Sequence, residues 1–441
     1  MLSDLRDRLS SPTARGLADA VGRAVGEGAL VPGARLPPIR QVASYLQLSP
    51  TTVSAAWQLL RRAGTIQTDG RRGTIVAPSR SGGPGRYRAA LRGRSGFPLD
   101  LSTGVPDPSL LPVFPSLSDF SAAPSSYLDE PVLPSLESHL RANWPHPPER
   151  LAIFDGAMDA IDQIASGLLR LGDRAVVENP CFPPLLDLLE ALGVRVVPVE
   201  TDACGALPTS LATALAERPA AVFLQPRALN PTGASWSSSR AGSLAAVLAP
   251  SDAYVVEDDS AGDVASSGLE SLGRLLPSRT LHVRSFSKSH GPDLRLAAVS
   301  GPSTVLDPIL ERRLLGQGWT SRLLQNLLLR LLTLPGPVTA VRHARDEYAR
   351  RRATVVAGLH HAGIELPPGD GLNIWLPVRD EQAALLFLAT NGIAAAAGAA
   401  FSVGSGAPHL RVTTGLITAD HAAVAGVLAA AAQARPLSSP R

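Results

Sequence analysis

The sequence contains very little lysine and cysteine. Only one of its 41 lysine and arginine residues is a lysine, Lys288. Its two cysteines, Cys181 and Cys204, are too few for a disulfide framework, which fits a reducing compartment. No apolar run approaches the ~20 residues that span a bilayer, and no charged-then-apolar signal segment opens the chain. We therefore expect a soluble, cytoplasmic protein that does not enter the membrane.

The single lysine is a candidate for covalent chemistry. Arginine keeps its positive charge under all working conditions, whereas lysine can become a neutral, nucleophilic amine. Schiff-base formation with an aldehyde is the first function to consider for such an amine. The alternative is that one solvated lysine has survived by chance in a composition dominated by Ala, Leu, Arg, Gly and Pro. The number of lysines alone does not distinguish covalent chemistry from chance survival, so the surrounding motifs must decide between the two interpretations.

The charges are unevenly distributed along a chain of 441 residues, which is long enough for two or three domains. Residues 1–97 carry 15 arginines against five acidic residues, a balance of +10. The remainder carries 26 basic and 33 acidic residues, a balance of −7. This split indicates an N-terminal module that meets a polyanion, joined to a mildly acidic body. A solvated basic tail would give the same balance.

The N-terminal segment shows the signals of a winged helix-turn-helix. Apolar residues recur there at helical spacing, and the third helical pattern has Ser49 as a plausible N-cap and Gly64 after its end. Two helices joined by a short turn form a helix-turn-helix, and a following hairpin adds the wing. The expected elements are helices over residues 10–27, from Pro38 and from Pro50, and strands at Thr65–Thr68 and Gly73–Val76.

This segment resembles the GntR-type DNA-binding domain over residues 32–76, where "PGARLP", "TTV" and "GRRGTIV" match in register. The family's arginine at the start of the recognition helix is Pro50 here, so one usual DNA contact is missing. Because one helix-turn-helix reads few base pairs, we expect a homodimer on double-stranded DNA. The resemblance implies these DNA-binding residues: Arg35, Arg40, Ser49, Thr51, Thr52, Ser54, Gly70, Arg71 and Arg72.

Residues 77–98 are rich in Arg, Gly, Ser and Pro, the composition of a flexible linker. After them, short apolar runs alternate with helical patterns. This order predicts a mostly parallel α/β sheet, whose ligand sites lie at the carboxyl ends of the strands. Asn230, Asp258 and Lys288 each follow such a run, so we expect them to meet in one crevice. Taken singly, they also fit a turn, a helix cap and a solvated side chain.

The order "NPTG", "VVEDD", "SFSKSHGPDLRL" and "HLRV" resembles the aminotransferase class I/II family of fold type I pyridoxal 5′-phosphate (PLP) proteins. A GntR-type head on such a body is similar to the MocR subfamily of bacterial transcription regulators. The resemblance implies a winged helix-turn-helix domain at 1–78 and a linker at 79–98. It further implies an α/β fold type I aminotransferase-like domain at 99–435 with a smaller C-terminal subdomain, PLP as cofactor, and a place at the bacterial nucleoid.

The same resemblance assigns roles in the expected pocket. Lys288 would form the internal aldimine with PLP, Asp258 would pair with the pyridine nitrogen, and Asn230 would bond to the ring oxygen. Arg411 would receive the carboxylate of an amine or amino-acid effector. No metal site is predicted. The other assigned residues are Phe182 on the ring face; Ser285, Arg295 and the backbone amides of Gly156, Ala157 and Met158 on the phosphate; and Tyr127, which would reach the phosphate of a partner subunit.

Departures from the aminotransferase pattern cluster in this expected pocket, and two of them are alanines. Ala261 stands where relatives carry a tyrosine that touches the ring oxygen, and Ala157 replaces a side-chain phosphate donor. Both losses weaken the case for catalytic turnover more than the case for binding. We therefore expect a PLP-responsive, dimeric transcription regulator. The alternatives are an aminotransferase with an auxiliary DNA-binding domain, and a regulator whose vestigial body serves only for dimerisation.

Overall fold

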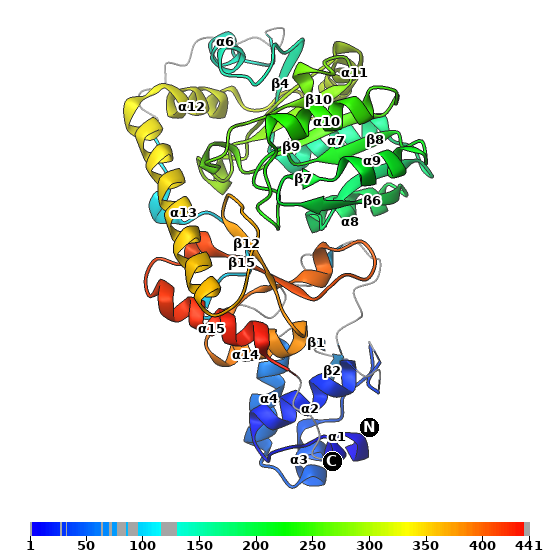
Figure 1. Cartoon of the computed structure of the whole chain (residues 1–441), viewed down its shortest axis with the longest axis vertical. Coiled ribbons are helices and arrows are strands. Elements are labelled where there is room, and N and C mark those ends of the chain that lie inside the picture. Colours follow the sequence, from blue (N-terminus) through cyan, green and yellow to red (C-terminus); the bar gives the residue numbers. More distant parts are fainter. Residues whose placement is uncertain are drawn as a thin grey trace. The chain divides into compact units, whose positions relative to one another are not determined.

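The computed structural model describes residues 2–26, 29–31, 33–62, 65–69, 73–76, 85–86, 96–115 and 130–435. The chain forms two compact units, whose elements are labelled in Figure 1. One comprises Met1–Gly104, Thr354–Leu366 and Trp375–Arg441, and the other comprises Val105–Ala353 and Pro367–Ile374. Helix α13 (Pro335–His361) and strand β12 (Asn373–Pro377) each run from one unit into the other. Within the described residues, no helix is long and apolar enough to cross a membrane.

The N-terminal part of the first unit is a winged helix-turn-helix, as predicted. Gln47 ends α3 with a left-handed φ of 56°, and its N–H donates to the Ala43 carbonyl, which closes the turn. Ser49 caps α4, because its Oγ accepts the Thr52 N–H at 3.0 Å. Strands β1 and β2 pair antiparallel. The elements are α1 (Leu2–Asp7), α2 (Ala14–Gly26), α3 (Ile39–Leu46), α4 (Pro50–Arg62), β1 (Ile66–Asp69) and β2 (Gly73–Val76).

Several details of this head differ from the prediction. Strand β1 begins and ends one residue later than Thr65–Thr68, and α3 begins at Ile39, with Pro38 as its N-cap. Helix α2 begins at Ala14 rather than near Ser10, because Thr13 Oγ1 accepts the Gly16 N–H at 3.1 Å and so acts as the N-cap. A short additional helix, α1, precedes it and buries Leu5 completely. All four helices therefore contribute to the apolar core of the head, which includes Leu5, Leu17, Val21, Val42, Val53 and Leu60.

The rest of the first unit contains a small α/β subdomain. Strand β3 pairs in parallel with β13, and β14 pairs antiparallel with β15, where Ala396 lies opposite Arg411. The smaller C-terminal subdomain expected from the sequence is thus confirmed. Its elements are β3 (Leu99–Asp100), α14 (Glu381–Thr390), β13 (Ile393–Ala394), β14 (Ala396–Ala397), η6 (Gly398–Phe401), β15 (His409–Thr413), η7 (Thr414–Leu416) and α15 (His421–Gln433).

The second unit is built around an eight-stranded sheet with the order β4-β11-β10-β9-β8-β5-β6-β7. Strands β10, β9, β8, β5 and β6 are parallel, whereas β11 and β7 run antiparallel to their neighbours. The mostly parallel sheet is confirmed, with two antiparallel strands that the sequence pattern did not indicate. The strands are β4 (Arg150–Phe154), β5 (Arg174–Asn179), β6 (Arg195–Asp202), β7 (Gly205–Ala206), β8 (Ala221–Leu224), β9 (Tyr254–Asp259), β10 (Thr280–Ser285) and β11 (Ala297–Gly301).

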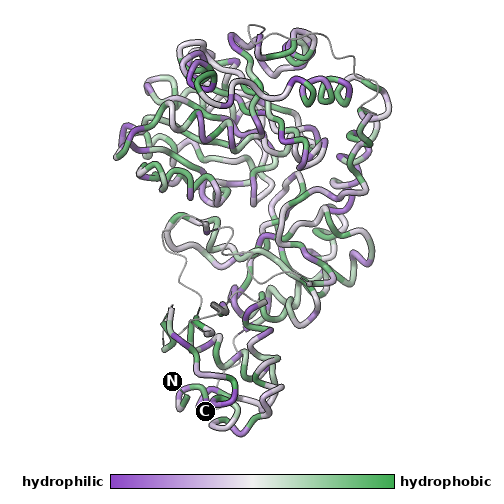
Figure 2. The backbone as a smooth tube through the Cα atoms, turned by 180° about the vertical axis from the view of Figure 1, so that it is seen from behind, coloured by the Kyte–Doolittle hydropathy of each residue, from purple (hydrophilic) through white to green (hydrophobic). Residues whose placement is uncertain are grey.

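Helices bury this sheet. Helix α7 packs against β4, β10 and β11, while α9 and α10 share an apolar cluster with Val176, Val222 and Val255 of the sheet. Strand β8 is buried along its whole length. In Figure 2 this unit shows both green, hydrophobic stretches and purple, hydrophilic ones. The helices are α6 (Pro134–Ala142), α7 (Ala157–Leu168), α8 (Pro183–Ala191), α9 (Pro208–Leu215), α10 (Ser238–Leu248), α11 (Ser303–Leu314), α12 (Arg322–Thr333) and α13, with 3₁₀ turns η1 (Pro108–Leu110), η3 (Gly262–Val264), η4 (Leu272–Arg274) and η5 (Pro292–Leu294).

Candidate functional site

Polar side chains gather where the parallel strands β8, β9 and β10 end. The strands lie in register, with Val283 of β10 opposite Asp258 of β9. Asn230 follows β8 and Lys288 follows β10. The charge of Lys288 acts on Asp258, and the side chain of Gln225 connects Asp258 with Asn230. The structure thus brings together the three residues that the sequence placed at neighbouring strand ends.

Asp258 has one carboxylate oxygen engaged and one unused. Gln225 Nε2 donates to Asp258 Oδ2 at 2.6 Å, whereas Asp258 Oδ1 is buried and has no hydrogen-bond partner among the described residues. Burial raises the pKa of Asp258 to about 6, and the nearby Lys288 ammonium works against that rise. An unused buried oxygen is costly unless something donates to it. The carboxylate is therefore suited to a ligand with a cationic N–H group.

Gln225 is a site residue that the sequence reasoning missed. In addition to its bond to Asp258, its Oε1 accepts the Asn230 N–H at 2.7 Å. Its own N–H donates to Glu178 Oε2 at 2.8 Å. The side chain is 7% exposed, so these bonds are shielded from water. Gln225 therefore fixes the position of the Asn230 backbone relative to the Asp258 carboxylate.

Glu178 is a second buried acid behind this site. Burial raises the pKa of Glu178 to about 8, although backbone N–H groups of Gln225 and Ala206 bond to the carboxylate and oppose the rise. At neutral pH Glu178 is therefore mainly protonated. A neutral Glu178 leaves Asp258 as the negative charge of this region, since Asp259, the next residue, is neutralised by an arginine.

The candidate lysine lies just beyond β10. Lys288 is half-buried, and its Nζ donates to the Ser260 carbonyl at 3.4 Å. Ser285, the last residue of β10, is buried and its Oγ accepts the Ser287 N–H at 3.3 Å. Phe182 is half-buried and immediately precedes α8, beyond the end of β5. Because β5 pairs in parallel with β8, Phe182 belongs to the same edge of the sheet.

Gly156 and Arg295 lie against each other at the start of α7. Arg295 Nη2 donates to the Asp155 carbonyl at 3.1 Å, and a Cβ at Gly156 would lie 2.7 Å from that Nη2. Gly156 has a φ of 108°, so it is required both for the close approach and for the backbone conformation. It is the N-cap of α7, and the amides of Ala157 and Met158 follow it. A helix N-terminus beside a guanidinium is suited to a phosphate.

The structure describes the positions of both alanines that depart from the aminotransferase pattern. Ala261 is 4% exposed and packs with Ala228 and Ala265 in a small apolar cluster, so this position offers no hydrogen-bond donor. Ala157 is the first residue of α7. An acidic residue, Asp159, lies in the first turn of the same helix. Both of its carboxylate oxygens are engaged, by the Asp155 N–H at 3.0 Å and by a glutamine side chain at 2.8 Å.

Arg411, the expected carboxylate receptor, belongs to the other compact unit. It lies on β15, is 1% exposed, and donates through Nη2 to the Ser102 carbonyl. Its guanidinium lies 5.1 Å from the centre of the Phe401 ring. A Cβ at Gly104 would come within 2.9 Å of Arg411 Nη1. The side chain is thus held in a fixed, buried position.

The described DNA-binding candidates lie on the surface of the head. Arg35, Arg40, Ser49 and Thr51 are exposed, and Thr52 and Ser54 are half-buried. Ser49 Oγ lies 2.7 Å from both Thr51 Oγ1 and Thr52 Oγ1, so three hydroxyl groups cluster at the N-terminus of α4. Four predicted site residues lie outside the described residues: Gly70, Arg71, Arg72 and Tyr127.

Comparison with known families agrees with this division of the chain. Residues 112–428 match the aminotransferase class I and II family, and residues 13–76 match the gntR family of bacterial regulatory proteins. The vitamin B6 salvage pathway transcriptional repressor PtsJ of Salmonella typhimurium is 36% identical, over 92% of this chain and 95% of its own. The pyridoxine biosynthesis transcriptional regulator PdxR of Corynebacterium glutamicum is 29% identical, over 69% of this chain and 70% of its own.

Solved structures give the same fold for the body. An archaeal alanine:glyoxylate aminotransferase superposes with a TM-score of 0.69 and 20% identity, over 78% of this chain and 93% of its own. The α-aminoadipate aminotransferase LysN of Thermus thermophilus superposes with a TM-score of 0.67 and 20% identity, over 78% and 95%. The chain therefore belongs to the MocR-type family of bacterial regulators, in which a gntR-family DNA-binding domain is joined to a domain of the class I and II aminotransferase family.

Proposed function

We propose that the protein is a PLP-responsive transcription regulator in which Lys288 binds PLP covalently and an amine or amino acid modulates promoter binding. The observation that carries this proposal is the unused, buried Asp258 Oδ1 beside the only lysine of the chain. The names of two relatives refer to the regulation of vitamin B6 salvage and of pyridoxine biosynthesis, which supports the same cofactor.

The residues present fit PLP, which supplies an aldehyde for reaction with amines and a pyridine ring that withdraws electrons. Asp258 Oδ1 would accept from the protonated ring nitrogen, and the Asn230 side chain would bond to the ring oxygen. Phe182 would cover one face of the ring. The phosphate would be held by Ser285, by Arg295, and by the backbone amides of Gly156, Ala157 and Met158.

The pocket supports ligand sensing better than catalytic turnover. Ala261 and its apolar neighbours Ala228 and Ala265 provide no hydrogen bond to the ring oxygen. One hydrogen bond fewer at that oxygen changes how well charge is stabilised on the ring. A sensor needs only that bound and free states differ in their affinity for DNA. We therefore assign PLP a regulatory role in this chain.

Promoter recognition requires two heads, so we propose a homodimer that binds DNA at the bacterial nucleoid. Arg411 would receive the carboxylate of the effector, and Tyr127 would reach the phosphate bound by the partner subunit. We also propose that the DNA-binding domain ends at residue 78 and that the linker ends at residue 98. The wing residues Gly70, Arg71 and Arg72 would contact flanking phosphates or the minor groove.

Arg40→Ala should weaken binding to the promoter about ten-fold, because an exposed guanidinium that contacts DNA contributes about 1–3 kcal/mol. Fluorescence anisotropy with a duplex selected in vitro measures the change. Arg195→Ala is the matched control, since it removes the same charge from an exposed position in the body. Equal DNA affinity of the two variants would show that Arg40 does not face DNA.

Gln225→Ala should weaken PLP binding at least five-fold, because it removes the bond to Asp258 and leaves the Asn230 N–H buried without its acceptor. Gln225→Glu should weaken it further, since a second negative charge would face Asp258 and favour its protonation. Absorbance titration gives the PLP dissociation constant, and repeating it across pH gives the midpoint of the spectral change. A positioning role requires both quantities to change, whereas the exposed control Gln433→Ala should alter neither.

A further inference from the structure

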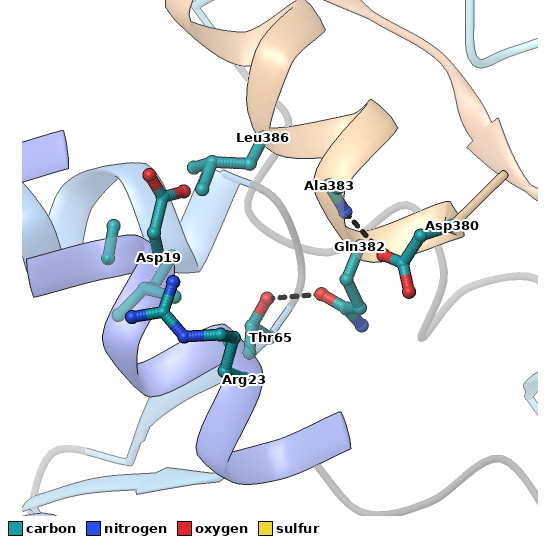
Figure 3. A pocket seen from close by; sticks show the side chains of 10 residues that line it. Asp19, Arg23, Thr65, Asp380, Gln382, Ala383 and Leu386 are labelled. Carbon is teal, nitrogen blue, oxygen red and sulfur yellow. Dashed lines mark hydrogen bonds between the residues drawn. The ribbon is translucent and has the colours of Figure 1, made fainter. Parts of the chain in front are cut away.

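The first compact unit contains a contact between the DNA-binding head and helix α14 of the C-terminal subdomain (Figure 3). Leu386 of α14 is 6% exposed and belongs to the same buried cluster as Leu17 and Leu60 of the head. The guanidinium of Arg15, on α2, lies 5.7 Å from the centre of the Phe387 ring on α14. The head thus completes part of its apolar core with side chains from a segment more than 300 residues away in the sequence.

A partly buried hydrogen bond lies beside this apolar contact. Thr65 Oγ1 donates to Gln382 Oε1 at 2.7 Å, and Thr65 is 3% exposed. Thr65 stands between the recognition helix α4 and the wing strand β1, and its own N–H donates to the Leu60 carbonyl at the end of α4. The bond to Gln382 therefore acts at the junction of the two elements that would read DNA.

The contact is incompletely packed. A cavity of about 180 Å³ lies between the head and α14, lined by Asp19, Arg23 and Leu60 on one side and by Asp380, Gln382 and Leu386 on the other. Arg23 is 7% exposed; its Nη2 donates to the Arg8 carbonyl, and within the part of the chain that the structure describes its Nε and Nη1 have no hydrogen-bond partner. Burial raises the pKa of Asp19 on the same surface. Charged, partly unsatisfied groups and a cavity are typical of an interface that separates readily, in contrast to a closed core.

The first turn of α14 is bonded to the strand that carries Arg411. The Glu381 carboxylate accepts the Ala399 N–H at 3.0 Å and the His409 N–H at 3.4 Å. His409 begins β15, on which Arg411 lies. Ala399 belongs to η6, whose last residue, Phe401, lies under the Arg411 guanidinium. Glu381 thus connects the strand that carries Arg411 to the first turn of α14, and Gln382 is the next residue.

We propose that α14 is the docking surface for the DNA-binding head of the same chain, and that it couples the carboxylate site at Arg411 to the position of the head. This coupling rests on the proposed function, whereas the docking itself does not. When a carboxylate ligand binds Arg411 and shifts its side chain, β15 and Glu381 shift the first turn of α14, and the Thr65–Gln382 bond transmits the shift to α4 and β1. A variant that lacks the Thr65–Gln382 hydrogen bond still binds the effector, but effector binding no longer changes its affinity for DNA.

Three variants of the full-length protein test the docking: Gln382→Ala, Thr65→Val and, as control, Thr390→Ala. Thr390 is exposed on the same helix, and its hydroxyl donates only within α14. Hydrogen exchange is measured without ligand on amides of α2, α4 and α14. We expect faster exchange in Gln382→Ala and Thr65→Val, and wild-type exchange in Thr390→Ala. Gln382 lies outside the head, so its variant remains informative if Thr65→Val unfolds the head. Wild-type exchange in Gln382→Ala overturns the docking proposal.

The coupling is tested with N-(5′-phosphopyridoxyl)-L-alanine, a stable adduct that carries an amino-acid carboxylate. The ratio of DNA affinities with and without the adduct is expected to be about 5- to 150-fold in the wild type and to approach one in Gln382→Ala. An unchanged ratio in Gln382→Ala overturns the coupling and leaves the proposed function standing. A ratio of one in the wild type contradicts the proposed function, while the exchange measurement still decides the docking.

Discussion

Lys288→Ala should abolish covalent capture of PLP, because no other side chain of the chain is a primary amine. The loss has a second cause: the Lys288 charge lowers the pKa of Asp258, so its removal favours the protonated acid still more. A protonated Asp258 no longer attracts a cationic ring nitrogen. We therefore expect both the covalent bond and most of the noncovalent affinity to disappear.

Two readouts separate these effects. Borohydride reduction followed by peptide mass spectrometry should find one phosphopyridoxyl group on the peptide with Lys288 in the wild type and none in the same peptide of the variant. Lys288→Arg keeps the positive charge near Asp258, so it should bind PLP reversibly without the covalent product. A phosphopyridoxyl group fixed mainly at the N-terminus of the wild-type chain would show that Lys288 does not capture the cofactor.

Arg227→Met should lower the free energy of unfolding by about 3–5 kcal/mol, because it strands a buried carboxylate. Arg227 Nε and Nη2 both donate to Asp259 at 2.8 Å, and Asp259 is fully buried. Asp259 is buried, yet the Arg227 charge and hydrogen bonds hold its pKa below the usual value. Loss of the arginine therefore leaves an uncompensated charge in the core.

The double variant Arg227→Met/Asp259→Leu should recover most of this loss, since it removes both charges and keeps the volume apolar. Arg150→Met is the matched control: Arg150 pairs with Asp307 at 2.6 Å, but its side chain is 52% exposed, so the expected cost is at most about 1 kcal/mol. Thermal and urea unfolding of the wild type and the three variants measure these differences in the free energy of unfolding. Equal stability of Arg227→Met and Arg150→Met would mean that the buried pair is not needed at the end of β9.

The head could be predicted almost completely, because its signals are local. Helix spacing, the Ser49 cap and the short turn before it specify a helix-turn-helix without reference to the rest of the chain. The largest shifted boundary, at Ala14, is also local in origin, since Thr13 replaces Ser10 as the start signal. The other shifts are of one residue, at the starts of α3 and β1. Helix α1 was missed because its single buried residue, Leu5, packs on distant parts of the head.

The candidate site was only partly predictable. Asp258, Asn230 and Lys288 follow apolar runs, and parallel strands necessarily bring such positions to one edge. Gln225 has no comparable signal, because its role depends on which strands are neighbours and on where Asp258 lies in the register. The raised pKa of Glu178 likewise follows from its burial in the folded unit and not from its sequence neighbours.

The contact between Thr65 and Gln382 was also beyond sequence reasoning. The two residues are separated by most of the chain, and each belongs to a segment whose local pattern is complete without the other. Gln382 and Leu386 look like ordinary positions of a short, mostly apolar helix. Only the folded unit shows that one face of α14 is covered by the head.

Titration of PLP during promoter binding is the most direct test of the proposed function. In the wild type, saturating PLP should change the affinity for the selected duplex by about 5- to 150-fold, and Lys288→Ala should show the same affinity with and without PLP. Reduced protein with PLP fixed on Lys288 should behave as the saturated wild type. If PLP occupies Lys288 and the affinity and footprint of the wild type stay unchanged, the protein is not a PLP-responsive regulator.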